Sequence, residues 1–435
     1  MSRRKQARRF DGSVSLVVCS GAHVPWRIVP RPIALGAHHR PSPSRRPWPQ
    51  GTVKEIHRRA EMSSIVASPS QRITLSSAET ARLTGGARFD GIMAVLSAWI
   101  VAGFYIDGWS HRHVTVLETF FTIWHVPLYS GYVATACFTI AAIRQGTRKG
   151  APWRQALPGG YGMAAVGLAI FAAGGMADML WHELFGFEKA VETVISPSHL
   201  LIYIGVGLTV SGPLRAAWHR GDATAENAPP HVTDIWPALL SLTLLWSVFT
   251  FVTMFVHPFV GARPGLTNWT LVASFGPTAL GFASSEGLSG IVVQTAMMMG
   301  LTLLAIGRWR LPFGSLTAVF TGNAALVSLL DEQFLLILPA LVGGLGADLL
   351  LRWLQPSAGR RWAYRLFAVA VPLMLYAGYF ICLKAREGLG WSVHMITGGL
   401  VLAGITGWLL SYLVFPPPLG ARHESGGHTA DQTAL

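Results

Sequence analysis

The chain has 435 residues, of which 51% are hydrophobic and 13% are charged, and its formal net charge is +13. A soluble domain has about a quarter charged residues, so this composition excludes an ordinary soluble fold. The positive charge does not indicate nucleic-acid binding, because residues 1–61 hold 13 Lys and Arg against 3 Asp and Glu, which is +10 of the total.

The first predicted segment, residues 1–86, is a basic leader rich in Arg, Pro and Ser with no periodic apolar face. Such a composition is typical of disorder. The leader also lacks the continuous apolar core of a signal peptide. We therefore expect either a disordered leader or a natural start at Met62, with residues 1–61 as an over-extended reading frame. Residues 416–435 are predicted to be a disordered C-terminal tail.

Residues 87–415 form the predicted membrane domain. Apolar runs of about 18 residues or more recur there, and each is long enough to cross a hydrocarbon layer of about 30 Å as a helix. The sequence therefore predicts an all-α integral membrane protein with about ten transmembrane helices. We place these near residues 88–106, 117–142, 161–177, 197–217, 235–256, 287–307, 313–330, 334–351, 364–383 and 392–415.

Lys and Arg are distributed unevenly between the loops on the two sides. The segments 143–154, 213–220, 307–310 and 351–365 are basic and lie on the side of the leader. Because cytoplasmic loops carry the excess of Lys and Arg, we expect a multi-pass protein of the cell membrane with both termini cytoplasmic. The extracytoplasmic face then gathers the titratable residues Asp107, His111, His113, His125, Asp178, His182, His199, His257, Glu387 and His394.

An internal repeat is visible when the chain is aligned with itself. LETFFTIWHVPLYSG (117–131) matches VETVISPSHLLIYIG (191–205), and DGWSH (107–111) matches DMLWH (178–182). The matched positions include Glu, Thr, His and Tyr, which chance similarity between apolar segments does not usually pair. We interpret the match as a two-helix repeat near residues 91–142 and 162–217. EGLGWSVH (387–394) repeats only the second half of the unit.

The spacing within each repeat predicts a three-residue site. Asp178 and His182 are four residues apart and so project from the same face of a helix. In SPSH (196–199) the predicted N-cap is Ser196, with Pro197 at the first helical position. His199 then lies in the first turn, where the helix dipole favours neutral imidazole. The predicted ligands are Asp178, His182 and His199 in the second repeat, and Asp107, His111 and His125 in the first.

Three interpretations fit such a set of residues: a metal site, an ion-paired network that holds helix ends together, and a proton relay. Glu118 and Glu192 are expected to cap helices or to orient a histidine. His113 competes with His111, while His257 and His394 could complete either set or support it by hydrogen bonds. The stretch GGLGADLLLR (343–352) resembles residues 174–182 but carries Arg352 in place of His, and we expect Asp348 to pair with a nearby arginine.

The residue types restrict which metal is expected. The chain has three cysteines, Cys19, Cys137 and Cys382, and no CxxC motif. Imidazole with carboxylate suits zinc, Cu(II) and iron, and the lack of clustered thiolates argues against a Cu(I) carrier. Three protein ligands leave an open position, which is typical of a reactive site. Histidines near helix ends could also clamp haem b.

The stretch D-M-L-W-H (178–182) followed by S-P-S-H (196–199) resembles the C subunit of the copper membrane monooxygenases, the particulate methane and ammonia monooxygenases. There, an Asp-x2-Trp-His at one helix end and a Thr-Pro-Ser-His opening the next helix supply one Asp and two His to copper. The resemblance implies that Asp178, His182 and His199 are copper ligands. It covers residues 178–205, and the 16 residues between the two histidines exceed the family's spacing by about one helical turn.

The resemblance implies a copper-dependent membrane monooxygenase subunit that oxidises small lipophilic substrates with dioxygen. Its partners would be the lipid bilayer, other membrane subunits and an electron donor such as quinol. The chain carries no cupredoxin-like domain and no match for the family's further Asn/His site. Two alternatives stay open: copper or zinc binding for uptake or delivery, and a transporter or haem protein. The few charges in the middle of the spans count against a transport pathway.

Overall fold

The computed structural model describes residues 86–114, 122–186, 191–220, 232–357 and 359–416. Within these ranges the regular structure is helical, apart from an isolated bridge between Gly265 and Leu389. The predicted leader up to residue 85, the predicted tail from residue 417 and Glu118 lie outside the described residues. The start at Met62 therefore stays a prediction.

The helices follow one another along the chain with short connections. The first part contains α3 (Ala87–His113), α4 (His125–Arg148), α5 (Gly162–Phe185), α6 (Glu192–Ile195), α7 (Pro197–Val210), α8 (Gly212–Arg220) and α9 (Val232–Val252). The second part contains α10 (Leu266–Ala273), α11 (Pro277–Arg308), α12 (Ser315–Leu329), α13 (Ile337–Leu354), α14 (Arg361–Arg386) and α15 (Val393–Val414). Three 3₁₀-helices, at Trp153–Gln155, Met254–Val256 and Phe334–Leu336, lie in the connections.

Nine helices among the described residues are long and apolar enough to cross a membrane. This count fits a multi-pass membrane protein and agrees with nine of the ten predicted spans. The predicted span 313–330 corresponds to α12, which has 15 residues. A helix of that length is about 22 Å long, shorter than a hydrocarbon layer of about 30 Å.

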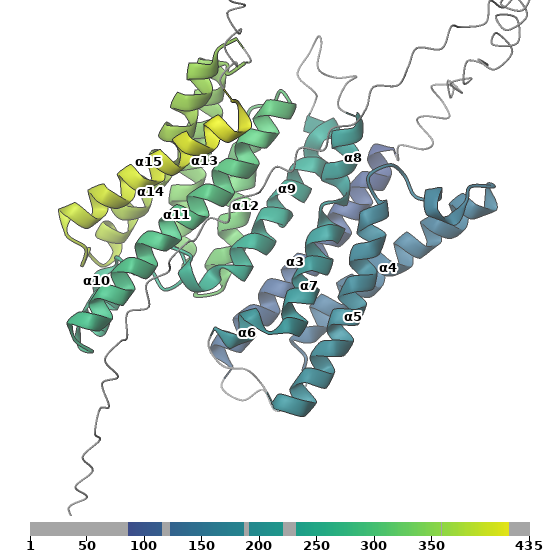
Figure 1. Cartoon of the computed structure of the whole chain (residues 1–435), viewed down its shortest axis with the longest axis horizontal. Helices are drawn as coiled ribbons and strands as arrows, with labels where there is room; N and C mark the ends of the chain where they lie inside the picture. The colour runs from purple at the N-terminus through teal and green to yellow at the C-terminus, as the bar shows by residue number, and fades with distance from the viewer. Residues whose placement is uncertain (1–85, 115–121, 187–190, 221–231, 358, 417–435) are drawn as a thin grey trace, which may run out of the picture. The chain divides into compact units, whose positions relative to one another are not determined.

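Apart from α8, which continues α7, and the short helices α6 and α10, successive helices run in opposite directions, so their ends collect on two sides (Figure 1). At one side, Arg112 at the end of α3 pairs with Asp331 after α12, with 2.5 Å between Nη2 and Oδ1. We name this side the triad end, because the two predicted sets of three ligands lie there. At the other side, the Arg308 guanidinium at the end of α11 donates to the carbonyl oxygen of Trp218 in α8, at 2.8 Å. We name this side the basic end.

Close helix contacts fix the parts of the fold that carry the predicted ligands. A Cβ atom at Gly103 of α3 would lie 2.4 Å from the backbone nitrogen of Leu128 in α4, so only glycine allows this approach. In the same way, a Cβ atom at Gly205 of α7 would lie 2.6 Å from the backbone nitrogen of Phe171 in α5. The predicted repeats therefore form two tightly packed antiparallel pairs, α3 with α4 and α5 with α7.

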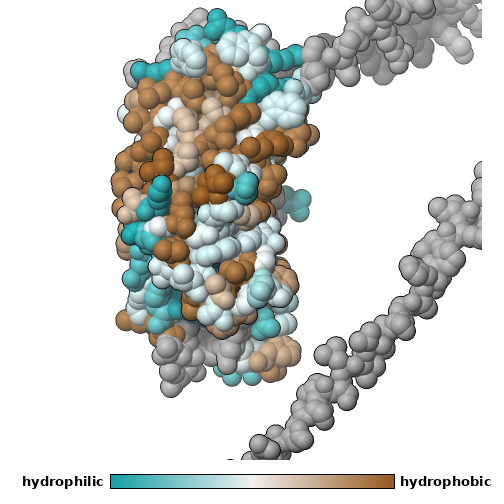
Figure 2. Space-filling model, turned by 90° about the vertical axis from the view of Figure 1, so that its left-hand side faces the viewer, coloured by the Kyte–Doolittle hydropathy of each residue, from teal (hydrophilic) through white to brown (hydrophobic). Residues whose placement is uncertain are grey.

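The outer surface of the helices is largely apolar. Figure 2 shows hydrophobic side chains over much of the face that lies on the left of Figure 1, with hydrophilic side chains at its upper edge. Leu304, Leu349 and Leu413, with exposed fractions of 47%, 54% and 78%, are among the large apolar side chains at the surface. Such a surface is stable in contact with lipid and would be costly in water.

One sequence prediction about the second part is wrong. Asp348 does not pair with an arginine: its carboxylate accepts hydrogen bonds from the backbone N–H groups of Leu316 and Thr317, at 3.1 and 2.9 Å, and from the Thr317 hydroxyl at 2.6 Å. These donors belong to the first turn of α12. A carboxylate is stable there because it satisfies N–H groups that have no partner within the helix.

Candidate metal centre

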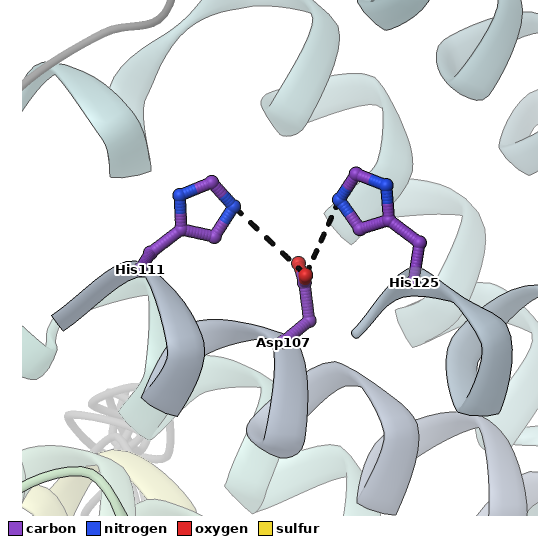
Figure 3. A group of neighbouring side chains, drawn as sticks. All are labelled: Asp107, His111 and His125. Atoms are coloured by element: carbon purple, nitrogen blue, oxygen red, sulfur yellow. Dashed lines mark ion pairs between the residues drawn. The ribbon is translucent and has the colours of Figure 1, made fainter. Parts of the chain in front are cut away.

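The first group of predicted ligands lies at the triad end, where α3 meets α4. Asp107 and His111 are one turn apart on α3, and His125 is the first residue of α4. The Oδ1 atom of Asp107 lies 3.2 Å from Nε2 of His125 and 3.9 Å from Nε2 of His111. Both rings turn a nitrogen toward the carboxylate (Figure 3). We name Asp107, His111 and His125 the first triad.

The second group has the same plan on α5 and α7. Asp178 and His182 are one turn apart near the end of α5, and His199 lies in the first turn of α7. The Asp178 carboxylate lies 3.1 Å from Nε2 of His199 and 3.5 Å from Nε2 of His182. Asp178 and His182 are buried. We name Asp178, His182 and His199 the second triad.

The start of α7 positions His199 as the sequence predicts. Pro197 is the first helical residue, and the N-cap Ser196 accepts a hydrogen bond from the backbone N–H of His199 at 3.4 Å. Ser198, which lies between Pro197 and His199, donates its hydroxyl to the Oδ1 atom of Asp178 at 2.8 Å. The capped first turn thus brings the predicted ligand His199 and the hydroxyl of Ser198 to the end of α5.

The hydrogen bond of His199 to the backbone determines which ring nitrogen faces Asp178. Nδ1 of His199 lies 2.6 Å from the carbonyl oxygen of Thr193. A carbonyl oxygen only accepts, so Nδ1 carries the proton and the neutral ring has its lone pair on Nε2. That lone pair lies against a carboxylate oxygen. Because both atoms are acceptors, a metal cation or a second ring proton must lie between Nε2 of His199 and the carboxylate oxygen of Asp178.

The distances within the triads separate hydrogen bonding from shared coordination. A hydrogen bond between N and O measures about 2.7–3.2 Å. Two ligand atoms at about 2.0–2.1 Å from one tetrahedral ion lie about 3.3 Å apart. The separations of 3.1 and 3.2 Å suit either case, that of 3.5 Å lies at the outer limit of a hydrogen bond, and that of 3.9 Å exceeds it. In each triad the ligand atoms lie within 4.8 Å of one another.

Asp107 adds an independent observation. Its Oδ1 atom is buried and accepts no hydrogen bond from the described residues, although Nε2 of His125 is 3.2 Å away. A buried carboxylate oxygen without a hydrogen bond is costly. A cation held between Asp107 and the two histidines would remove this cost, so the residues present fit a metal ion.

The two triads face a common cavity. Its lining includes five of the six triad residues, namely Asp107, His111, His125, Asp178 and His199, together with Tyr129, Tyr203 and Met254. Tyr129 lies between the triads: its ring contacts His125 edge-on, with 5.9 Å between centroids, and its hydroxyl lies beside Gly175 of α5. The cavity of about 40 Å³ has room for one or a few water molecules.

The residues predicted to surround the ligands lie in different places. His113 points away from the first triad: its Nδ1 atom lies 2.9 Å from the carbonyl oxygen of Trp109, and its ring stacks on the indole. The Glu192 side chain is exposed, and the atom that holds His199 is the carbonyl oxygen of Thr193. His394 is exposed in the first turn of α15.

His257 is buried, but it lines a separate small cavity with Gln294, Asn323 and Tyr376. Its Nδ1 atom accepts a hydrogen bond from the backbone N–H of Phe259 at 3.1 Å. Burial lowers the pKa of His257 to about 3. The ring is therefore neutral and belongs to the packing of the second part of the fold.

Sequence reasoning missed three contributors: Ser198, the Thr193 carbonyl group and Tyr129. Ser198 could have been found, since a serine directly before a predicted ligand in a capped first turn lies near the same site. The other two depend on how the helix pairs meet, and no local pattern encodes that. Comparison of the chain with family models, curated proteins and solved structures finds no match.

Proposed function

We propose that this chain is a membrane metalloprotein whose two triads each bind one metal ion, with copper as the preferred metal. The observation that carries the proposal is the placement of two Asp/His/His sets around one cavity, each with its ligand atoms within 4.8 Å of one another. Neutral imidazole and carboxylate groups suit Cu(II), zinc and iron. The motif at residues 178–199, which resembles the copper membrane monooxygenases, favours copper among these metals.

The reaction class proposed for the site is oxidation of a small lipophilic substrate. Copper, when bound, would supply the chemistry that activates dioxygen. The chain's own residues hold the ligands in place: the Thr193 carbonyl fixes the ring of His199, and Ser198 fixes the carboxylate of Asp178. The apolar side chains of Phe104, Leu128 and Phe251 line the same cavity, and its volume of about 40 Å³ would admit only a very small apolar substrate.

Metal uptake or delivery is the alternative that the same ligands permit. It shares the two sites but requires no oxidation of a substrate. The position of the triads near helix ends, close to one side of the helices, suits exchange of an ion with a partner protein. The basic end, opposite the triads, supports an orientation in which the triads face away from the cytoplasm.

Metal content of the purified full-length chain tests the proposal. After reconstitution with Cu(II) and removal of excess ion, we expect about two copper ions per chain and an EPR signal with nitrogen hyperfine structure. His125→Ala and His199→Ala should each remove one ion, and the double variant should remove both. His394→Ala is the matched control, because it removes an exposed histidine at the same end of the helices.

The outcomes separate the interpretations. Copper that is retained equally by the double variant and by the control would contradict the metal sites and favour an ion-paired network or a proton relay. Copper bound at both triads without dioxygen consumption, in the presence of quinol and a short-chain hydrocarbon, would favour uptake or delivery. Dioxygen consumption that depends on both additions would support oxidation. A Soret band would favour haem.

A further inference from the structure

The basic end holds a second, larger cavity that is unrelated to the triads. It lies where α11 and α13 end and where the connection to α12 begins, and its volume is about 490 Å³. This volume falls in the range of about 300–1,000 Å³ that is usual for ligand pockets. Its lining includes Trp309, Arg310, Phe313, Asp348, Arg352 and Arg360. We name it the arginine pocket.

The arginine pocket has a surplus of positive charge. Three guanidinium groups line it, against the single carboxylate of Asp348. That carboxylate is already engaged by three hydrogen bonds from the first turn of α12. Among the described residues, no carboxylate forms an ion pair with Arg310, Arg352 or Arg360. The three guanidinium groups are therefore available to an anion from outside the chain.

One of the guanidinium groups is held in place by an aromatic ring. The Cζ atom of Arg352 lies 4.4 Å from the centroid of Phe313, a cation–π contact that fixes the side chain. A positioned guanidinium recognises phosphate in a bidentate manner, which a flexible lysine cannot do. The carboxylate of Asp348 in α13 already occupies the N-terminus of α12, so recognition of an anion depends on the arginines.

The surroundings place the pocket at the level of lipid headgroups. Trp353 and Trp362, which are 75% and 60% exposed, lie on the ends of the neighbouring helices α13 and α14. Exposed tryptophans near the ends of transmembrane helices are typical of the membrane interface. Exposed Leu345 and Leu349 continue along α13 from there toward the middle of the helix and offer an apolar path for acyl chains.

We propose that the arginine pocket binds the phosphodiester headgroup of an anionic phospholipid. Arg310, Arg352 and Arg360 contact the phosphate oxygens, Trp309 and Phe313 cover the glycerol region, and the acyl chains lie along α13. A basic cavity between transmembrane helices on the cytoplasmic side is a site where anionic lipids accumulate. This inference does not depend on metal binding at the triads.

Native mass spectrometry of the full-length chain in a neutral detergent tests the proposal. The chain is titrated with phosphatidylglycerol, with phosphatidylcholine of the same acyl chains, and with inorganic phosphate. We expect phosphatidylglycerol to bind at least tenfold more tightly than phosphatidylcholine. In the double variant Arg310→Gln/Arg352→Gln, the affinity for phosphatidylglycerol should fall at least tenfold, while that for phosphatidylcholine stays unchanged.

The matched control is Lys149→Gln/Arg154→Gln, which removes the same charge from the basic end outside the arginine pocket. It should retain the affinity for phosphatidylglycerol. Equal losses in the two double variants would show a general charge effect and overturn the pocket. Inorganic phosphate that binds as tightly as phosphatidylglycerol would assign the pocket to free phosphate and overturn the lipid. Unchanged size-exclusion profiles confirm that the variants fold.

Discussion

The Nε2 atom of His199 lies 3.1 Å from the Oδ1 atom of Asp178, although the two residues belong to different helices. The contact depends on the first turn of α7, which also supplies the hydroxyl of Ser198 to the same oxygen. The geometry of the second triad is therefore set by a helix start and not by a flexible loop. Small changes to that turn should alter metal binding without changing the ligands.

Removal of the Ser198 hydroxyl tests this dependence. In Ser198→Ala, the Asp178 carboxylate loses a donor at 2.8 Å and is less firmly oriented. Loss of a residue that orients a ligand typically weakens metal affinity about 10–100-fold. We expect this loss for one of the two copper ions, measured by competition with a chelator. Ser211→Ala, at the other end of α7, should bind both ions normally. Equal weakening of both ions by Ser198→Ala would contradict the assignment.

His111 and His113 form a natural pair for a second prediction. They are two residues apart on α3, but only His111 has its ring near Asp107, since His113 bonds to the carbonyl oxygen of Trp109. His111→Ala should therefore remove the copper ion of the first triad, and His113→Ala should retain it. Copper content and the EPR spectrum measure the difference. The reverse result would show that His113 is the ligand and that the side chains rearrange on binding.

The sequence predicted which residues come together in each triad because their spacing is local. Residues four apart on a helix share a face whatever the tertiary fold, and the Ser-Pro-Ser-His stretch marks a helix start by itself. The apolar helices could be predicted in the same way, because an apolar run of about 18 residues or more is a signal in the sequence itself. One exception is α11, which begins at Pro277 although the predicted span begins at residue 287, because Ser284, Ser285 and Glu286 interrupt the apolar run.

The meeting of the two triads could not be read from the sequence. Asp107 and Asp178 are distant in the chain, and they line one cavity only because α3 packs against α7, which in turn packs against α5. The same limitation explains the wrong prediction for Asp348. The charge pattern suggested an arginine partner for Asp348. The fold instead places the N–H groups of the first turn of α12 against its carboxylate. Backbone donors carry no signal in a sequence.

Gly103 links helix packing to the first triad, which leads to a third prediction. A methyl group at this position would lie 2.4 Å from the backbone nitrogen of Leu128, so Gly103→Ala must push α4 away from α3. His125, at the start of α4, would then move away from Asp107. We expect loss of the copper ion of the first triad and retention of the other. Gly300→Ala is the control, because a Cβ atom there meets no atom within 4 Å. Two retained ions in Gly103→Ala would show that the helices adjust without moving the triad.

Stability at low pH provides the fourth prediction, through His257. Burial lowers its pKa to about 3 in the folded chain, against about 6.5 in the unfolded chain. The unfolded state therefore takes up a proton below about pH 6.5 that the folded state refuses. The free energy of unfolding is therefore unaffected by protonation of His257 above about pH 6.5. It falls progressively as the pH falls toward 3, by up to about 1.4 kcal/mol per pH unit.

His257→Asn should flatten this dependence, because asparagine can still accept the hydrogen bond from the Phe259 N–H group but does not titrate. The measurement is the free energy of unfolding in detergent at about pH 7 and about pH 4.5, for the wild-type chain and the variant. His394→Asn removes an exposed histidine and should keep the wild-type slope. The difference between wild type and variant cancels the titration of the triads, since both chains contain them. Identical slopes in all three chains would contradict the prediction, because they would show that His257 takes up its proton in the folded chain.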